Sequence, residues 1–150
     1  MASEVRVFLD TSALFAAVLS EKGGSRLILK LGEAGAVQLW VGPRVLQEAD
    51  AVLARKAVEN KALFALLLDR AKVSVGPEPD DTALAQARTV VDYPPDARIV
   101  AEALAVDADY LVSLDREHLV GNPRASELPF LVGTPGDFLA WFREHLQEST

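Results

Sequence analysis

Near its amino terminus the chain reads Val5-Arg6-Val7-Phe8-Leu9-Asp10-Thr11-Ser12. Its first five residues are mostly apolar and partly β-branched, which favours a buried strand. The next three, Asp10, Thr11 and Ser12, are residue types that commonly begin helices, and the apolar run from Leu14 to Leu19 follows them. The sequence therefore predicts a strand that passes directly into a helix, with an acid at the carboxyl end of the strand.

The same alternation of strand and helix continues along the chain. Further strands are predicted over residues 37–41, 73–75, 110–114 and 130–132. Helices are predicted to begin near residues 23–25, 42–43, 94–96 and 134–137, and to cover residues 57–71 and 80–91. Strands that alternate with helices indicate an α/β fold with a mostly parallel sheet covered on both faces, that is, a three-layer domain. We expect residues 1–150 to form one domain.

Composition excludes several classes of site. The chain has no cysteine, so a disulfide framework, thiolate catalysis and a Cys-ligated zinc site are excluded. Its two histidines, His118 and His145, are too few for a His-rich metal site. The longest apolar runs are far shorter than a membrane span, and strand-like sequence from Val5 leaves no room for a signal peptide. We therefore expect a soluble, cytoplasmic protein that is not attached to a membrane.

The formal net charge of −7 argues against a domain that coats nucleic-acid phosphates with basic residues. This objection weakens if some of the carboxylates are metal ligands, because a bound cation dominates the field around it. Two bound Mg²⁺ ions would bring the charge to about −3. The acidity is therefore compatible with a metal-dependent enzyme that acts on phosphates.

Four carboxylates are predicted to meet at one edge of the sheet. Asp10 and Asp115 each follow directly on an apolar strand, where the carboxyl ends of parallel strands line a crevice for ligands. Asp96 begins the helix before the Asp115 strand, and Glu48 lies early in the helix that follows residues 37–41. Clustered carboxylates need protons or a cation at neutral pH. Oxygen ligands favour Mg²⁺ or Mn²⁺, which can activate water for phosphodiester hydrolysis.

A plainer interpretation of the same residues remains open. Asp10, Asp96 and Asp115 all precede helix-like sequence, and aspartate is an ordinary helix N-cap. Glu48 alone is an ordinary solvated helix residue. Other α/β chemistries lack their residues: Asp10 is not followed by a second aspartate at the next position but one, no lysine follows Lys72, and no phosphate-binding glycine loop or nucleophile elbow occurs.

Four segments together resemble the PIN-domain family, and in size and pattern the toxin ribonucleases of VapBC-type toxin–antitoxin pairs. The resemblance extends over nearly the whole chain and rests on these four segments in this order: Val7-Phe8-Leu9-Asp10-Thr11-Ser12, Val45-Leu46-Gln47-Glu48, Pro95-Asp96-Ala97-Arg98-Ile99-Val100-Ala101-Glu102-Ala103-Leu104, and Ala108-Asp109-Tyr110-Leu111-Val112-Ser113-Leu114-Asp115-Arg116-Glu117-His118-Leu119. Each segment alone is weak, but all four in order are specific.

By this resemblance the acidic metal-binding quartet of the family is carried by Asp10, Glu48, Asp96 and Asp115. Ser12 and Ser113 stand where the family often has small polar residues, which would hold carboxylates or bound water. Two features depart from the common pattern. Leu114 replaces a frequent small residue, which would narrow the pocket. Asp92 competes with Asp96 for the third position, and we prefer Asp96 because the helix after it stands in the register of the family.

The resemblance implies a Mg²⁺- or Mn²⁺-dependent endoribonuclease that acts on single-stranded or looped RNA, forms homodimers and, if it is a toxin, binds an antitoxin that covers the acidic pocket. Candidate RNA contacts are Arg98 and Arg116, for which solvated surface ion pairs are the competing interpretation. Weaker candidates are Arg44 and Arg124. We expect His118 to be a half-exposed helix residue, and Trp40 and Trp141 to be core or interface anchors.

Two alternatives stay open. One is a catalytically inactive PIN-like module that binds or scaffolds, which the net charge and Leu114 favour slightly. The other is a housekeeping nuclease of the same fold with no antitoxin. Retention of four acids disfavours the inactive module, since clustered carboxylates destabilise a fold that does not use them.

Overall fold

The computed structural model describes residues 4–56 and 58–148. Within them a sheet of five strands has the order β3-β2-β1-β4-β5, and every neighbouring pair is parallel. The strands are β1 (Arg6–Leu9), β2 (Gln38–Val41), β3 (Ser74–Val75), β4 (Tyr110–Val112) and β5 (Leu131–Gly133). The prediction of an α/β fold with a mostly parallel sheet is confirmed.

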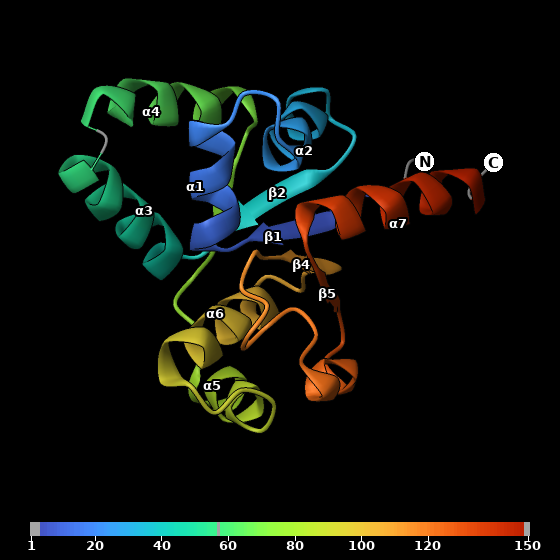
Figure 1. Cartoon of the computed structure of the whole chain (residues 1–150). Helices are drawn as coiled ribbons and strands as arrows, with labels where there is room; N and C mark the ends of the chain where they lie inside the picture. Colours follow the sequence, from blue (N-terminus) through green and yellow to red (C-terminus); the bar gives the residue numbers. More distant parts are fainter. Residues whose placement is uncertain (1–3, 57, 149–150) are drawn as a thin grey trace.

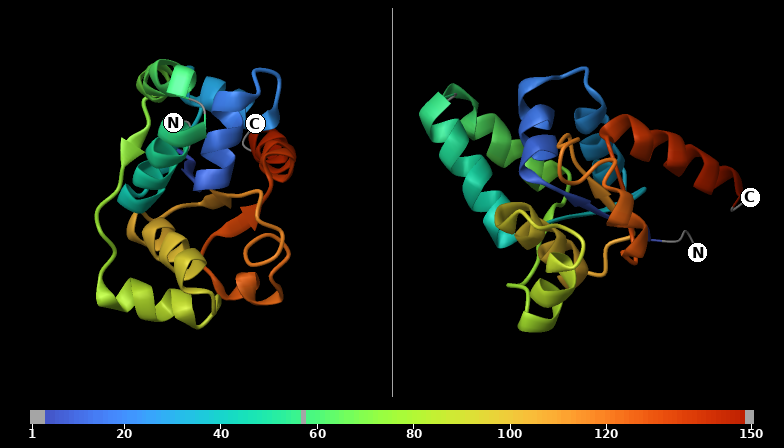
Figure 2. Two further views of the ribbon diagram at one scale, coloured as in Figure 1. Left: turned by 60° about the vertical axis from the view of Figure 1, so that its left-hand side comes forward. Right: turned by 60° about the horizontal axis from the view of Figure 1, so that its bottom comes forward.

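Seven helices cover the two faces of this sheet in the described part of the chain. Figure 1 shows α1, α2, α3, α4 and α7 on one side and α5 and α6 on the other, and Figure 2 shows the same three layers from two further directions. The helices are α1 (Thr11–Leu19), α2 (Gly24–Glu33), α3 (Pro43–Lys56), α4 (Lys61–Arg70), α5 (Asp81–Arg88), α6 (Pro94–Ala105) and α7 (Pro135–Glu148). Two short 3₁₀ helices are η1 (Val58–Asn60) and η2 (Pro123–Glu127).

Strand β1 is the centre of the core. Val7, Phe8 and Leu9 are all buried, as expected for a strand with helices over both faces. Phe8 lies opposite Trp40 of β2 and Leu111 of β4. From β1 the chain turns through α1 and α2 to β2, whereas β4, on the other side of β1, is reached through α5 and α6. The connections therefore diverge between β1 and β4, and a crevice is expected at the carboxyl ends of these two strands.

A buried carboxylate joins the two helical layers. Glu102 of α6 is 1% exposed, and its Oε2 accepts a hydrogen bond of 3.0 Å from the backbone N–H of Arg44, in the first turn of α3. Gly42, just before α3, makes room for it, because a Cβ at Gly42 would lie 2.1 Å from Glu102 Oε1. Glu102 thus fixes the start of α3, the helix that carries Glu48, against α6, the helix that carries Asp96.

Several boundaries differ from the sequence prediction. The strand predicted over 110–114 ends at Val112, so that Ser113 and Asp115 lie beyond it. Residues 116–121 form turns instead of the helix expected after Asp115. The helix predicted over 57–71 is η1 followed by α4, and Ala57 lies outside the described residues. No helix of the described chain combines the length and apolar character needed to cross a membrane.

Candidate metal centre

Asp10 lies where β1 ends and α1 begins, and it is 3% exposed. Its Oδ1 accepts hydrogen bonds from the backbone N–H of Ala13 at 2.9 Å and from the hydroxyl of Ser12 at 2.7 Å. The bond from Ala13 is an N-cap, so the capping interpretation is right for this residue. Capping uses Oδ1, whereas Oδ2 faces β4 and accepts a hydrogen bond from Ser113.

Two serines join the ends of β1 and β4. Ser113 is fully buried, and its hydroxyl donates to Asp10 while accepting the backbone N–H of Asp115 at 2.9 Å. The hydroxyl of Ser12 donates to Asp10 and accepts the backbone N–H of Leu114 at 3.0 Å. Each serine therefore joins Asp10 to the segment that carries Asp115. The part that the family resemblance gives Ser12 and Ser113 in a metal site stays a prediction.

Asp115 sits in the turn after β4. Its Oδ1 accepts the backbone N–H groups of Glu117 at 2.9 Å and His118 at 3.0 Å. These bonds leave Oδ2 to face Asp96, which lies in the first turn of α6 after Pro94 and Pro95. Asp96 is not the cap of α6, because Tyr93 holds that position.

His118 lies beside both Asp96 and Asp115. Its Nδ1 lies 2.9 Å from Asp96 Oδ2 and 3.4 Å from Asp115 Oδ2. One ligand atom from each of these three residues lies within 4.8 Å of the others. From the sequence, His118 is expected on a helix and has no part in a metal site. The structure places it in a turn, where the backbone N–H that bonds Asp115 also turns the imidazole toward the acids.

We refer to Asp10, Asp96 and Asp115 as the acid cluster, since the charges of these three side chains act on one another. Burial raises the pKa of Asp96 to about 6, and the neighbouring charge of Asp115 adds to the shift. Burial also raises the pKa of Asp10, more than the hydrogen bonds it accepts lower it. Burial raises the pKa of Asp115 as well, but its hydrogen bonds outweigh this effect and the pKa is lowered.

Adjacent carboxyls with opposite pKa shifts share protons or a cation. The charge of Asp115 beside Asp96 disfavours ionisation of Asp96, which a shared proton or a bound cation would relieve. Among the described residues, the buried Oδ2 of Asp96 has no hydrogen-bond donor aligned with it, although His118 Nδ1 is close. The carboxylate oxygens suit a small divalent cation such as Mg²⁺ or Mn²⁺.

Glu48 follows β2, at the same edge of the sheet, but it is not part of the group formed by Asp96, Asp115 and His118. Its Oε2 accepts the hydroxyl of Thr11 at 2.9 Å, and its Oε1 pairs with Arg44 Nε at 3.1 Å. Thr11 follows Asp10 directly, so these bonds bring Glu48 beside the acid cluster. Its side chain is 37% exposed and therefore accessible to solvent.

The two arginines named as candidate RNA contacts lie in different surroundings. Arg98 forms a hydrogen-bonded ion pair with Glu78, and its Nε lies 3.6 Å from buried Glu102. Arg98 is thus engaged within the protein. Arg116 is exposed, next to Asp115, and its charge acts on Asp137. Asp92, the competitor of Asp96, is exposed in the loop before α6.

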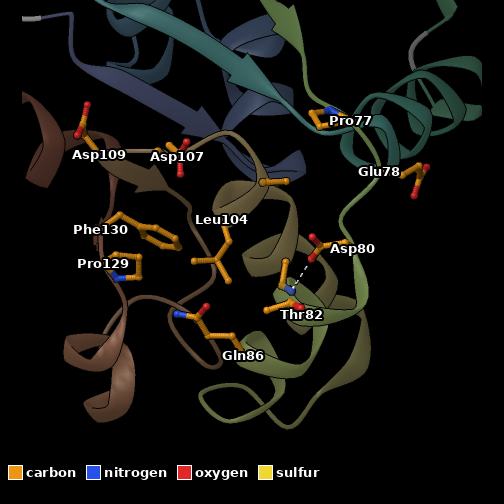
Figure 3. A pocket seen from close by; sticks show the side chains of 13 residues that line it. Pro77, Glu78, Asp80, Thr82, Gln86, Leu104, Asp107, Asp109, Pro129 and Phe130 are labelled. Atoms are coloured by element: carbon orange, nitrogen blue, oxygen red, sulfur yellow. Dashed lines mark hydrogen bonds between the residues drawn. The ribbon is translucent and has the colours of Figure 1, made fainter.

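The pocket in Figure 3 is separate from the acid cluster. It has a volume of about 610 Å³ and lies between α5, the end of α6 and the residues that precede β4 and β5. Leu104 and Phe130 line its apolar part, and Asp80, whose carboxylate caps α5 through the N–H of Ala83 at 2.8 Å, is at its edge. Asp107 and Asp109 precede β4, whereas Asp10 and Asp115 follow their strands, so this pocket adds no residue to the metal centre.

A parallel sheet with acids gathered beyond its central strands defines the class of protein. The family model for the PIN domain matches residues 6–117. The chain therefore belongs to the PIN-domain family, whose members are generally nucleases. No curated protein matches the chain.

Solved structures agree with this fold. One chain of VapBC2 from Rickettsia felis, crystallised with a DNA fragment from its promoter, is 17% identical with a TM-score of 0.64, and the match covers 86% of this chain and 98% of that one. PAE2754 from Pyrobaculum aerophilum is 17% identical with a TM-score of 0.57, over 96% of this chain and 99% of that one. At these identities the likeness concerns the fold.

Proposed function

We propose that this chain is a Mg²⁺- or Mn²⁺-dependent endoribonuclease that hydrolyses RNA phosphodiester bonds, with residues 1–150 acting as a single PIN domain. The observation that carries the proposal is the acid cluster, in which buried Asp10 and partly buried Asp96 have raised pKa values beside ionised Asp115. A cation that replaces the shared protons would stabilise a fold that contains such a cluster.

Asp10, Asp96 and Asp115 would hold the metal, and His118 adds a fourth donor. The metal, when bound, lowers the pKa of water and stabilises charge on the phosphate. Ser113 and Ser12 keep the Asp10 and Asp115 segments in fixed positions through their hydrogen bonds. These bonds supply the preorganisation that hydrolysis requires.

Glu48 is suited to orient the attacking water and to accept its proton. Its two oxygens are held by Thr11 and Arg44 while part of the carboxylate stays open to solvent. The oxygen of that water forms the new bond to phosphorus as the bond to the leaving oxygen breaks. Glu48 would take up the proton of the water, and the leaving oxygen would take up a proton from solvent, so that Glu48 is regenerated when it releases its own. Arg116, exposed next to Asp115, is the arginine placed to meet a substrate phosphate.

We further propose that the protein is the toxin of a VapBC-type pair, working in the cytoplasm as a homodimer with an antitoxin partner. The structural likeness to a chain of the VapBC2 complex supports this assignment. A housekeeping nuclease without an antitoxin is the alternative within the same chemistry. A neighbouring short reading frame for a DNA-binding protein, whose product copurifies with this chain and blocks cleavage, would separate the two.

Cleavage of a labelled single-stranded RNA tests the activity. We expect cleavage with Mg²⁺ or Mn²⁺, none with a chelator, and a loss of roughly two orders of magnitude or more for Asp96→Asn. Asp92→Asn is the matched control, because it removes an exposed carboxylate from the same loop and should cleave like wild type. Equal cleavage by the wild type and Asp96→Asn would refute the assignment. RNA binding by the wild type without any cleavage would support the inactive binding module.

A further inference from the structure

An exposed aromatic ring lies beside the acid cluster. Tyr93, the last residue before α6, is 50% exposed. Its ring stacks on the imidazole of His118, with centroids 4.8 Å apart and planes 16° from parallel. His118 in turn contacts both Asp96 and Asp115. A half-exposed tyrosine is therefore one side chain away from two of the proposed metal ligands.

The ring borders a hollow of about 300 Å³. The hollow lies between residues 90–93, before α6, and residues 117–124, after Asp115. Asn122 holds these two segments together, because its Nδ2 donates to the carbonyl of Val90 at 3.1 Å and to that of His118 at 3.0 Å. Arg124 also lines the hollow; its side chain is 51% exposed, and its guanidinium pairs with Glu127. The hollow is thus bounded by a flat ring, an amide and a cation, and the acidic residues Asp92 and Glu117 also line it.

Packing alone does not require this exposure. Tyr93 makes no side-chain cap for α6, and half of its surface remains in water. An aromatic ring that is held in place by stacking on one side and open on the other is suited to bind a flat apolar ligand. Unpaired nucleobases stack on such rings, and every base has the required face.

We propose that Tyr93, supported by His118, is a stacking platform for an unpaired nucleobase next to the phosphate that is cleaved. The inference rests on the proposed nuclease function and names a residue that would contact a base of the substrate. A base within a duplex is covered by its neighbours and cannot reach the ring, so the platform selects single-stranded or looped segments. Arg124, on the far side of the hollow, is placed to meet the backbone of the same strand.

Two variants separate stacking from support of the metal centre. Tyr93→Phe keeps the ring, and Tyr93→Leu keeps an apolar side chain without it. We expect Tyr93→Leu to raise KM for a single-stranded RNA about 5- to 100-fold, the range for loss of one stacked base, while Tyr93→Phe stays close to wild type. The rise in thermal midpoint caused by Mn²⁺ should be the same in all three proteins. For an RNA that lacks the base next to the cleavage site, wild type and Tyr93→Leu should have similar KM values.

Binding of the same RNA, measured by fluorescence anisotropy with the full chain in the presence of Ca²⁺, gives a readout independent of turnover. Weaker binding by Tyr93→Leu than by Tyr93→Phe supports the platform. Wild-type cleavage with an unchanged KM and unchanged binding in Tyr93→Leu overturns the platform and leaves the nuclease assignment intact. A fall in kcat together with a lost Mn²⁺ response would mean that Tyr93 serves only to hold His118, which also overturns the platform. Absence of both cleavage and RNA binding in wild type overturns both proposals.

Discussion

Replacing Gly42 by alanine should destabilise the contact between α6 and the start of α3. The new Cβ would lie 2.1 Å from Oε1, 2.3 Å from Cδ and 2.8 Å from Cβ of Glu102. Ordinary van der Waals contact begins near 3.4 Å, so the carboxylate must move by more than an ångström. Its 3.0 Å hydrogen bond from the N–H of Arg44 is then lost.

The cost follows from two effects. Overpacking a tight site costs about 1–3 kcal/mol, and losing a hydrogen bond to a charged group costs about 1.5–3 kcal/mol. Alanine gains about 0.4–1 kcal/mol by restricting the unfolded chain. We therefore expect Gly42→Ala to lower the free energy of unfolding by about 3 kcal/mol. In a domain of this size the thermal midpoint should fall by roughly 6–12 °C.

Thermal and denaturant unfolding of five proteins measures this effect: wild type, Gly42→Ala, Gly136→Ala, Glu102→Ala and the double variant Gly42→Ala/Glu102→Ala. Gly136→Ala is the matched control, because the nearest atom to its new Cβ is Thr134 Oγ1 at 3.9 Å and the site is open. It should be neutral or slightly stabilising. In a Glu102→Ala background the cost of Gly42→Ala should shrink, leaving only the contact with the Cβ of residue 102. An equal cost in both backgrounds, or a stable Gly42→Ala protein, would refute the account of this junction.

Three further predictions concern the metal centre. In the presence of a chelator, protonation of Asp96 stabilises the fold fully below the pKa of the unfolded state, near 3.8, and this contribution is lost as the pH rises through about 6. The thermal midpoint of wild type should therefore fall relative to that of Asp96→Asn between about pH 4 and pH 7. Parallel midpoints, or a change in the opposite direction, would contradict the claim that burial raises the pKa of Asp96. Ser113→Ala should lower the free energy of unfolding by about 1–3 kcal/mol, because it leaves the buried hydrogen-bond partners of Ser113 unpaired, and should weaken Mn²⁺ binding about 10- to 100-fold. Exposed Ser126→Ala is the control, and equal Mn²⁺ affinities of wild type and Ser113→Ala, measured by calorimetry, would exclude the positioning role. Glu48→Gln should lower kcat while keeping most of the Mn²⁺-induced stabilisation, since Glu48 lies outside the three-residue ligand group; loss of that stabilisation would instead make it a ligand.

Local sequence was sufficient to predict the sheet and the acids beyond it. Asp10 and Asp115 follow apolar strands, and parallel strands must bring their carboxyl ends to the same edge. Asp96 could be placed because Pro94 and Pro95 mark the start of its helix. The preference for Asp96 over Asp92 agrees with where each lies, one against Asp115 and the other in solvent.

Long-range contacts account for what the sequence did not indicate. His118 was expected on a helix because residues 115–119 have helix-like composition, but Asp115 accepts two backbone N–H groups and closes a turn there. The spacing Asp115-x-x-His118 was the available signal. The burial of Glu102 could not be predicted from the sequence, because Arg98 and Glu102 have the i, i+4 spacing of an ordinary surface ion pair. Only the packing of α6 on Gly42 shows that this carboxylate is buried.

The most direct test of the metal centre is the thermal midpoint of wild type, Asp96→Asn and Asp92→Asn with increasing Mn²⁺ or Mg²⁺. A cation that binds only the folded protein adds about 2.7 kcal/mol at 100 times its Kd, which is about 5–11 °C in a domain of this size. We predict this rise for wild type and Asp92→Asn, and little or none for Asp96→Asn. Equal midpoints with and without metal in all three proteins would contradict the claim that these acids form a metal centre.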